Sequence, residues 1–183
     1  MRKVAILTGA LLALAFVGCT QAPTEEDKKV AETKAAELKA KDVADIKAIF
    51  DKAAQSLKAK DVNAIMTNYV ADDSLLVFDA MVPRQYKGAA AYRKDFEELI
   101  NVFAGDIEFT ISDVDVNAGA GDIAWATSIQ HMSGKMKDGK PMDITVRVTD
   151  NFKRTKGQWL IAHEHVSFPV DLATGKADLT SKP

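Results

Sequence analysis

The second half of the chain alternates apolar and polar residues over four long segments, and this period of two constrains the fold more than any other feature. Side chains of a β-strand point to opposite faces in turn, so such alternation predicts half-buried strands. The separators NAGAGD, KDGK and TKG are rich in residues that favour tight turns. Three turns between four strands predict an antiparallel meander, with strands over Asp106–Val116, Ile123–Ser133, Met142–Arg154 and Gln158–Phe168.

Three helices are predicted before this meander, because apolar residues there recur at helical spacing. They run from about Val43 to Lys58, from Val62 to Val70 and from Ala89 to Asn101. Asp42 and Asp61 each precede a helix, and a carboxylate in that position accepts hydrogen bonds from the free amides of the first turn. A short strand, Leu75–Phe78, lies between the second and third helices. Helices followed by one sheet predict an α+β domain.

The N-terminus predicts export from the cytoplasm. Arg2 and Lys3 precede the apolar run Val4–Val17. This run is at the upper end of the length of the hydrophobic region of a signal peptide, and it is too short to span a bilayer comfortably. The following FVGC resembles a bacterial lipobox, in which the cysteine is acylated and becomes the new N-terminus, although Phe16 stands where leucine is usual. Cys19 is the only cysteine, so no internal disulfide can form. We expect a lipid anchor at Cys19; the alternative is an ordinary signal peptide with an incidental cysteine.

These features divide the chain into four parts. Residues 1–18 are expected to be a lipoprotein signal peptide, and residues 19–41, rich in Ala, Lys and Glu, a polar tether and helical stalk. Residues 42–169 form the domain, and residues 170–183 a polar tail. The expected location is the bacterial cell envelope, lipid-anchored in the periplasm or on the outer face. The net charge is −2 and no basic stretch lacks interleaved acids, so no nucleic-acid partner is expected.

Four stretches resemble the nuclear transport factor 2-like group: DVNAIMTNYVADD, YKGAAAYRKDFEEL, RVTDNFKRTKGQW and WLIAHEHVS. The last two are most similar to its SnoaL-like and kinase association-domain branches. The resemblance covers about Val43 to Phe168 and implies three N-terminal helices packed on a strongly curved antiparallel sheet, with a cone-shaped pocket between them. The group includes ketosteroid isomerases, polyketide cyclases and an association domain of calcium/calmodulin-dependent protein kinase II. The resemblance therefore implies a fold without fixing an activity.

Two-residue loops at Asp138-Gly139 and Lys156-Gly157 would fix the register of the last three strands. Glu164 would then lie opposite Thr149, and Arg147 would lie between Gln130 and Val166. One face would carry the polar residues Ser128, Gln130, Arg147, Thr149 and Glu164. The other would carry Trp125, Ile129, His131, Val146, Val148, Trp159, Ile161, His163 and His165. A change of one residue in either loop would exchange these faces.

The three histidines admit three roles. His131, His163 and His165 could together bind zinc, but His131 and His165 would lie two strands, or nearly 10 Å, apart, so no metal site is expected. Catalysis by His163 or His165 as a general base stays open, although no orienting acid is visible beside either. The favoured interpretation is hydrogen-bonded histidines on an apolar surface with Trp125 and Ile129 that forms a homodimer interface.

The polar face is the expected pocket. The resemblance implies that Arg147 lines it, and a buried arginine needs a partner, either Glu164 or a carboxylate on the ligand. We therefore expect a membrane-tethered domain that binds a small, partly apolar ligand through Arg147, Gln130, Glu164 and Tyr69. If Arg147 pairs with the ligand rather than with Glu164, the ligand carries a carboxylate. No cofactor is expected. Tyr92, Phe96 and Phe78 could line the same pocket or serve only as core.

Two other functions stay open. An isomerase, cyclase or dehydratase would use a pocket acid or histidine, with His163, His165 and Glu164 as the catalytic candidates. Ketosteroid isomerases combine an acidic base with a tyrosine and a protonated acid, and the sequence alone does not assign those roles. The remaining alternative is a non-catalytic dimerisation or assembly module.

Overall fold

The computed structural model describes residues 23–119 and 121–181, so the predicted signal peptide and Cys19 lie outside the described residues. The elements are α1 (Glu25–Lys58), α2 (Val62–Met66), β1 (Leu76–Phe78), β2 (Tyr86–Lys87), α3 (Ala89–Val102), β3 (Phe103–Ala118), β4 (Ile123–Met136), β5 (Pro141–Thr155), β6 (Gln158–Ser167), β7 (Val170–Asp171) and β8 (Lys176–Ala177). The predicted α+β class is confirmed. Among the described helices, none combines the length and the apolar character that a membrane span requires.

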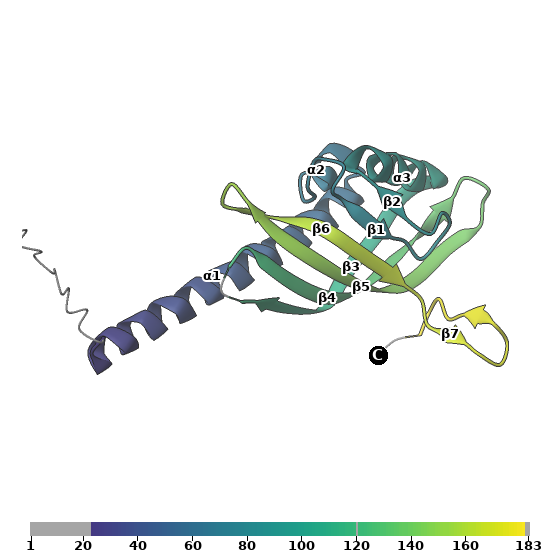
Figure 1. The fold of residues 1–183 in the computed structure, drawn as a ribbon. Helices are drawn as coiled ribbons and strands as arrows, with labels where there is room; N and C mark the ends of the chain where they lie inside the picture. The colour runs from purple at the N-terminus through teal and green to yellow at the C-terminus, as the bar shows by residue number, and fades with distance from the viewer. Residues whose placement is uncertain (1–22, 120, 182–183) are drawn as a thin grey trace, which may run out of the picture.

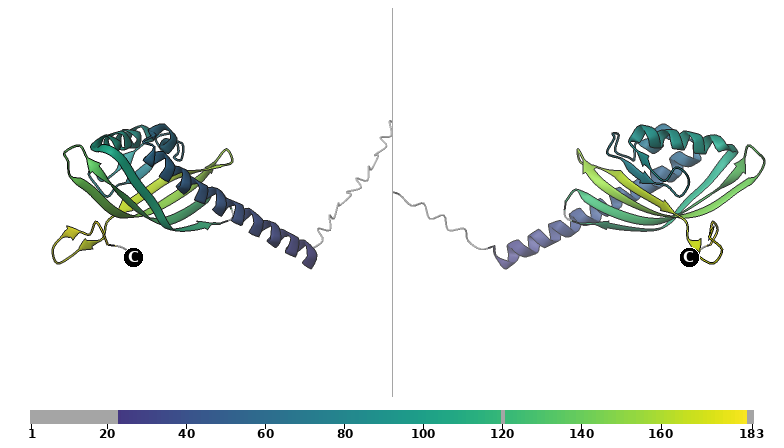
Figure 2. Two further views of the ribbon diagram at one scale, coloured as in Figure 1. Left: turned by 180° about the vertical axis from the view of Figure 1, so that it is seen from behind. Right: turned by 45° about the vertical axis from the view of Figure 1, so that its right-hand side comes forward.

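Six strands form one sheet in the order β2-β1-β6-β5-β4-β3, which contains the predicted four-stranded meander. Strand β1 extends it by pairing in parallel with β6. The sheet curves, and α2, α3 and the second half of α1 lie over its concave side (Figures 1 and 2). The core lies between these layers and includes Ile46, Phe50, Leu75, Val77, Phe152 and Ile161.

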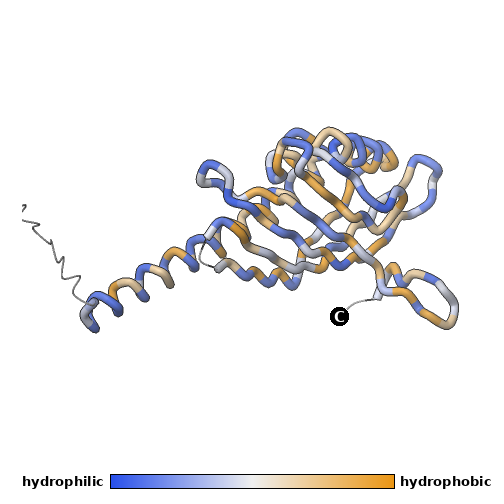
Figure 3. Tube along the Cα trace, viewed as in Figure 1, coloured by the Kyte–Doolittle hydropathy of each residue, from blue (hydrophilic) through white to orange (hydrophobic). Residues whose placement is uncertain are grey.

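Helix α1 joins the predicted stalk and the predicted first domain helix into one helix of 34 residues. It begins at Thr24, whose hydroxyl accepts a hydrogen bond from the Asp27 amide at 3.2 Å, while the Asp27 carboxylate accepts one from the Thr24 amide. Residues 25–41 are exposed on every side and project from the domain (Figure 1). Hydrophilic and hydrophobic residues mix along this arm (Figure 3), so it has no continuous apolar face to bury.

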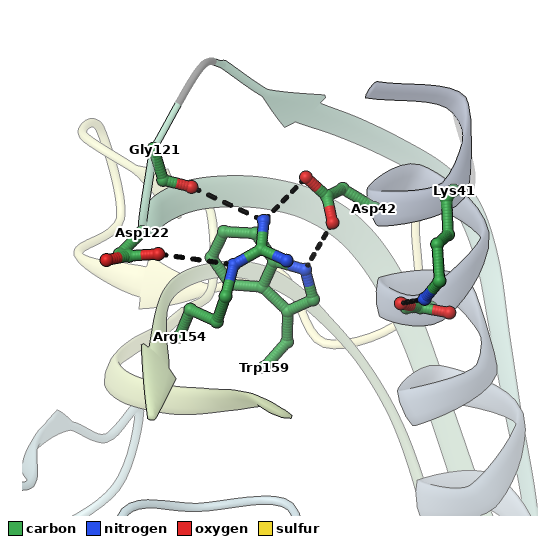
Figure 4. Close-up of polar contacts among 7 residues, drawn as sticks. Lys41, Asp42, Gly121, Asp122, Arg154 and Trp159 are labelled. Atoms are coloured by element: carbon green, nitrogen blue, oxygen red, sulfur yellow. Dashed lines mark hydrogen bonds and ion pairs between the residues drawn. The ribbon is translucent and has the colours of Figure 1, made fainter. Parts of the chain in front are cut away.

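Asp42 was predicted to cap the start of a helix, and this prediction is wrong. The residue lies inside α1. The surrounding Ala, Lys and Leu residues favour helix and carry it through this position. The Asp42 side chain, only 6% exposed, accepts hydrogen bonds from Arg154 Nη2 at 2.6 Å and Trp159 Nε1 at 3.2 Å (Figure 4). The Arg154 bond holds the pKa of Asp42 below its usual value. Asp42 therefore fastens α1 to the β5–β6 hairpin, whereas the predicted cap at Asp61 is confirmed.

The β4–β5 register differs by one residue from the prediction. Ile129, not Gln130, lies opposite Arg147. The connecting loop has three residues rather than two: Gly139 N donates to Met136 O at 2.9 Å, and Gly139 has a φ of 86°. A three-residue loop of this kind ends in a left-handed residue that glycine adopts without strain.

The β5–β6 register agrees with the prediction only near its turn. Lys156 and Gly157 form a two-residue loop with φ values of 51° and 81°. A bulge at Ala162 then shifts the pairing, so that Phe152 lies opposite Ile161 but Asn151 lies opposite His163. The predicted pairing of Glu164 with Thr149 is therefore wrong, and Glu164 lies opposite Asp150.

These two irregularities redistribute the side chains between the faces of the sheet. The concave face carries Ser128, Gln130, Val146, Val148, Asp150, Trp159, Ile161 and Glu164. The outer face carries Trp125, Ile129, His131, Arg147, Thr149, His163 and His165. The bulge explains how Trp159 and Ile161 can share a face with Glu164, because the extra residue interrupts strict alternation.

The predicted polar tail is partly ordered by hydrogen bonds. Strands β7 and β8 form a small separate hairpin. Beyond it, the carbonyl of Leu179 accepts a hydrogen bond from the Thr145 amide at 2.7 Å, which returns the chain to β5.

Candidate functional site

A cavity of about 370 Å³ lies between the helices and the concave face of the sheet. Its walls are mostly apolar and include Phe50, Phe96, Leu99, Phe109, Met132 and Ile144. The lining extends to Met81 and Val102, which are 51% and 38% exposed, so the cavity reaches the surface between the β1–β2 loop and the end of α3. A volume at the lower end of the range for small-molecule sites suits a compact ligand.

Two buried carboxyl groups form the polar part of this cavity. Asp150 on β5 and Glu164 on β6 lie opposite each other and are 1% and 6% exposed. Glu164 Oε2 also accepts a hydrogen bond from the Tyr69 hydroxyl at 2.8 Å, and Glu164 Oε1 accepts one from the Tyr92 hydroxyl. The two tyrosine rings pack edge to face with centroids 5.4 Å apart, which fixes both donors.

Burial raises the pKa of both acids, and their polar neighbours act differently on each. Burial and the neighbouring Glu164 charge raise the pKa of Asp150 well above its usual value. Burial also raises the pKa of Glu164, but the hydrogen bonds from Tyr92, Tyr69 and Asp150 oppose that rise. Asp150 is therefore the member of the pair that holds a proton more strongly. Burial raises the pKa of both tyrosines, so they remain donors.

One carboxyl oxygen of this cluster lacks a hydrogen-bond donor among the described residues. Asp150 Oδ1 is buried and has no hydrogen-bond partner among the described residues. A buried acceptor without a donor costs about 1–3 kcal/mol. The free oxygen belongs to a residue that lines the cavity, so a molecule in the cavity is the available source of a donor.

Three more acids line the cavity nearer its opening: Asp79, Asp95 and Glu98. The Tyr86 hydroxyl donates to Asp95 Oδ1 at 2.5 Å. Burial raises the pKa of Asp95 above its usual value, although the Tyr86 bond acts in the opposite direction. Among the described residues that line the cavity there is no lysine, arginine or histidine.

Three of the four predicted ligand contacts lie at this cavity. Tyr69, Gln130 and Glu164 line it, whereas Arg147 is exposed on the outer face of the sheet. The prediction for Arg147 rested on the family resemblance and on the assumed register, and the three-residue β4–β5 loop and the Ala162 bulge place its side chain on the other face. Consequently the predicted Arg147–Glu164 pair does not form, and Glu164 is held by Asp150 and two tyrosines.

Asp150 was missed as a site residue, and Tyr92 was considered only as wall or core. The sequence carries one signal for Asp150: an acid within the alternating strand VRVTDNF, at a position where the pattern calls for an inward side chain. Without the β5–β6 bulge, nothing in the sequence brings Asp150 opposite Glu164. Phe96 lines the cavity, whereas Phe78 does not and packs against His163 with ring centroids 5.1 Å apart.

The histidines lie on the outer face and do not line the cavity. His131 Nε2 bonds Asp143 Oδ1 at 2.9 Å, and His163 Nδ1 bonds the Leu76 carbonyl at 2.8 Å. His165 packs against the Phe78 ring. Within residues 23–119 and 121–181, no group of three or more His, Cys, Asp or Glu side chains is placed to hold a metal ion. This geometry favours the structural interpretation of the histidines and leaves Glu164 as the catalytic candidate that reaches the cavity.

Comparisons with known proteins identify relatives of this architecture. Residues 46–171 match the SnoaL-like domain family. A nuclear transport factor 2-like protein of unknown function from Pseudomonas putida KT2440 is 29% identical, with 76% of this chain and 95% of that chain covered and a TM-score of 0.68. No curated protein matches the chain.

Two more distant structures show the same fold. A proposed dehydratase of the nuclear transport factor 2-like family from Streptomyces avermitilis is 16% identical, covers 70% of this chain and 97% of its own, and gives a TM-score of 0.61. A proposed calcium/calmodulin-dependent protein kinase II association domain from Xanthomonas campestris is 20% identical, with 67% and 84% covered and a TM-score of 0.57. The family match spans most of the chain and agrees with the helices, the curved sheet and the cavity between them; the chain belongs to the SnoaL-like domain family.

Proposed function

We propose that this domain binds a small, largely apolar molecule whose polar group donates a hydrogen bond to Asp150. The observation that carries the proposal is the free Asp150 Oδ1, a buried acceptor in an otherwise apolar cavity. A ligand donor would remove the cost of that unsatisfied oxygen, and the apolar walls would bury the rest of the molecule. Tyr69 and Tyr92 would hold Glu164, which lies opposite Asp150, and Gln130 would contact the ligand from β4.

The acids of the cavity argue against the expected carboxylate ligand. Asp79, Asp95 and Glu98 line the approach, and Glu164 lies inside the cavity. A ligand carboxylate would be repelled by each of them, and Arg147 lies on the other face of the sheet. We therefore keep the expectation of a small apolar ligand and replace its carboxylate by a hydrogen-bond donor.

We also propose that the chain is lipid-anchored at Cys19 in the cell envelope. The exposed arm of α1 over residues 25–41 would then be a spacer of roughly 25 Å between membrane and domain. Incorporation of radiolabelled palmitate into the wild-type chain, but not into Cys19→Ser, would support this location. Equal labelling of both proteins would reject it.

Native mass spectrometry of the full chain, purified gently from the expressing cells, tests ligand binding. Val146 lines the cavity and Arg147, its neighbour, does not. We expect a bound small molecule in the wild type and in Arg147→Ala, and its loss in Val146→Trp, which fills the cavity. A molecule that remains in Val146→Trp, or that is lost in Arg147→Ala, would place binding elsewhere.

A second candidate function is proton transfer, favoured by the two buried carboxyl groups of Asp150 and Glu164, which lie opposite each other. A buried carboxyl pair can take a proton from a carbon beside a carbonyl and return it to the same molecule. Nuclear magnetic resonance would follow exchange of the α-hydrogens of a small cyclic ketone in D₂O. Catalysed exchange that is lost in Asp150→Asn but kept in Asp143→Asn, on the outer face, supports an enzyme. Exchange at the uncatalysed rate supports binding alone.

We propose in addition that the outer face of the sheet joins two copies of the chain. Ile123 and Trp125, which are 66% and 41% exposed, form an apolar surface there beside Ile129. Analytical ultracentrifugation should find a dimer that Trp125→Glu converts to a monomer. A wild-type monomer would remove this part of the proposal, and would also count against the alternative of an assembly module.

A further inference from the structure

Within the described part of the chain, the cavity is lined by carboxyl groups without a cationic counterpart. Asp79, Asp95 and Glu98 lie near its opening, and Asp150 and Glu164 lie inside, with no cationic side chain among the described lining residues. Lys94 Nζ lies 3.6 Å from Glu98 Oε1, but both side chains are largely exposed, at 76% and 68%. Such a pair neutralises little, because exposed ion pairs are weak and screened by salt.

An acidic lining alone would not define a ligand, but the buried cluster adds an independent observation. Asp150, 1% exposed, presents a carboxyl oxygen that no described residue satisfies. Beside it the Glu164 carboxyl group accepts hydrogen bonds from two neutral donors, the hydroxyls of Tyr69 and Tyr92. A buried negative charge without a countercharge is costly. The site therefore lacks both a donor and a positive charge at the same place.

We propose that the ligand is an apolar organic amine, whose ammonium group binds between Asp150 and Glu164 and whose apolar body fills the rest of the cavity. This inference rests on the proposed binding function and names its ligand class. The ammonium supplies the donor that Asp150 Oδ1 lacks and the countercharge that Glu164 lacks. A positive charge at that place also favours the ionised form of both carboxyl groups, and the proton that either one releases passes to the solvent.

Two further features fit a cation. Tyr69, Tyr92 and Phe96 pack together, with centroids of neighbouring rings 4.7–6.1 Å apart, and line the cavity beside the carboxyl pair. Aromatic rings attract a desolvated cation. The acids near the opening raise the local concentration of cations and lower that of anions.

Three probes with one skeleton separate the charge from the apolar body: phenylbutylamine, phenylbutanol and phenylbutyrate. Titration calorimetry of the full chain should give binding of the amine about tenfold or more tighter than that of the alcohol. The carboxylate should bind more weakly than the alcohol. Equal affinities for amine and alcohol, or tightest binding of the carboxylate, overturn this inference while the proposed binding function stands. No binding of any probe overturns both.

Variants in which carboxyl groups are replaced by amides show which acids cause the preference for the amine. The triple variant Asp79→Asn, Asp95→Asn, Glu98→Gln should weaken the amine about threefold or more and leave the alcohol unchanged. A matched triple variant, Glu108→Gln, Asp115→Asn, Asp143→Asn, removes the same charge from exposed positions that do not line the cavity. An equal loss of amine affinity in both variants would attribute the preference to net charge and overturn the inference.

Discussion

Asp150 is the residue on which the cavity chemistry depends most, and its buried position gives a signature in stability. Above the pKa of about 4 that an unfolded aspartate has, the unfolded chain releases this proton while the folded chain retains it, because burial raises the folded pKa. The wild type therefore loses stability as the pH rises from about 4 toward the raised pKa. Asp150→Asn keeps a donor toward Glu164 and escapes this loss.

We accordingly expect the free energy of unfolding of Asp150→Asn, relative to that of the wild type, to increase by about 1–3 kcal/mol between pH 4 and pH 8. Urea unfolding at pH 4, 6 and 8 measures the gain. The control is Asp143→Asn, an exposed acid on the outer face, whose difference from the wild type should stay small. A pH-independent difference for Asp150→Asn would show that Asp150 is ionised in the folded chain.

Single residues of the site were predictable where alternation and turn chemistry sufficed. Glu164, Gln130 and Tyr69 were expected at a pocket and line the cavity. Arg147 was expected with them, but its side depends on whether an Asp-Gly loop has two residues or three, and Asp-Gly suits both. Tyr92 was visible as an apolar helix position, yet its bond to Glu164 joins segments far apart in sequence.

Among the elements, α1 and the β5–β6 hairpin are held together by one polar cluster. Asp42 accepts from Arg154 and Trp159, and Arg154 also lies 3.3 Å from Asp122 and over the Trp159 ring (Figure 4). We expect Asp42→Ala to lower the free energy of unfolding by about 1–3 kcal/mol, because the indole N–H of Trp159 loses its acceptor and Arg154 loses its shortest ion pair.

Urea unfolding at neutral pH measures this effect against Asp45→Ala. Asp45 is partly buried, and its ion pair is with Lys41 on the same helix, a contact worth a few tenths of a kcal/mol. Equal losses in the two variants would contradict the role given to the Asp42 cluster.

Strand β4 passes closely beneath the start of β3 at Gly134. A Cβ there would lie 2.7 Å from Phe103 Cδ1 and 2.9 Å from the Asp106 carbonyl oxygen, and Phe103 is buried. We expect Gly134→Ala to destabilise the fold by about 1–3 kcal/mol in thermal unfolding. Gly105→Ala, with nothing within 4 Å of the added carbon, is the matched control and should change little. A tolerated Gly134→Ala would mean that β3 and Phe103 can shift.

The sequence predicted the secondary-structure elements better than it predicted the single residues of the site. Hydrophobic period and turn residues locate all four meander strands and α3 to within a few residues. The bulge at Ala162 was not predictable, because no glycine or proline marks it. The pairing of β1 with β6 was missed because a three-residue strand carries too short a pattern to indicate its neighbour.

The whole molecule consists of a packed domain and a projecting helical arm (Figures 1 and 2). Deletion of residues 25–38 should change the free energy of unfolding by less than about 0.5 kcal/mol, since every side chain removed is exposed. Thermal and urea unfolding of the shortened and complete chains measure the difference. A loss above about 1 kcal/mol would show that the arm contacts the domain in solution.

The central claim is that a molecule in the cavity contacts the free oxygen of Asp150. A crystal structure of the full chain, grown with whichever of the three phenylbutyl probes binds most tightly, tests it most directly. We predict the phenyl group among the apolar walls and the polar group within about 3 Å of Asp150 Oδ1. A probe bound on the outer face of the sheet, or a cavity that holds only water at saturating probe, would contradict the account.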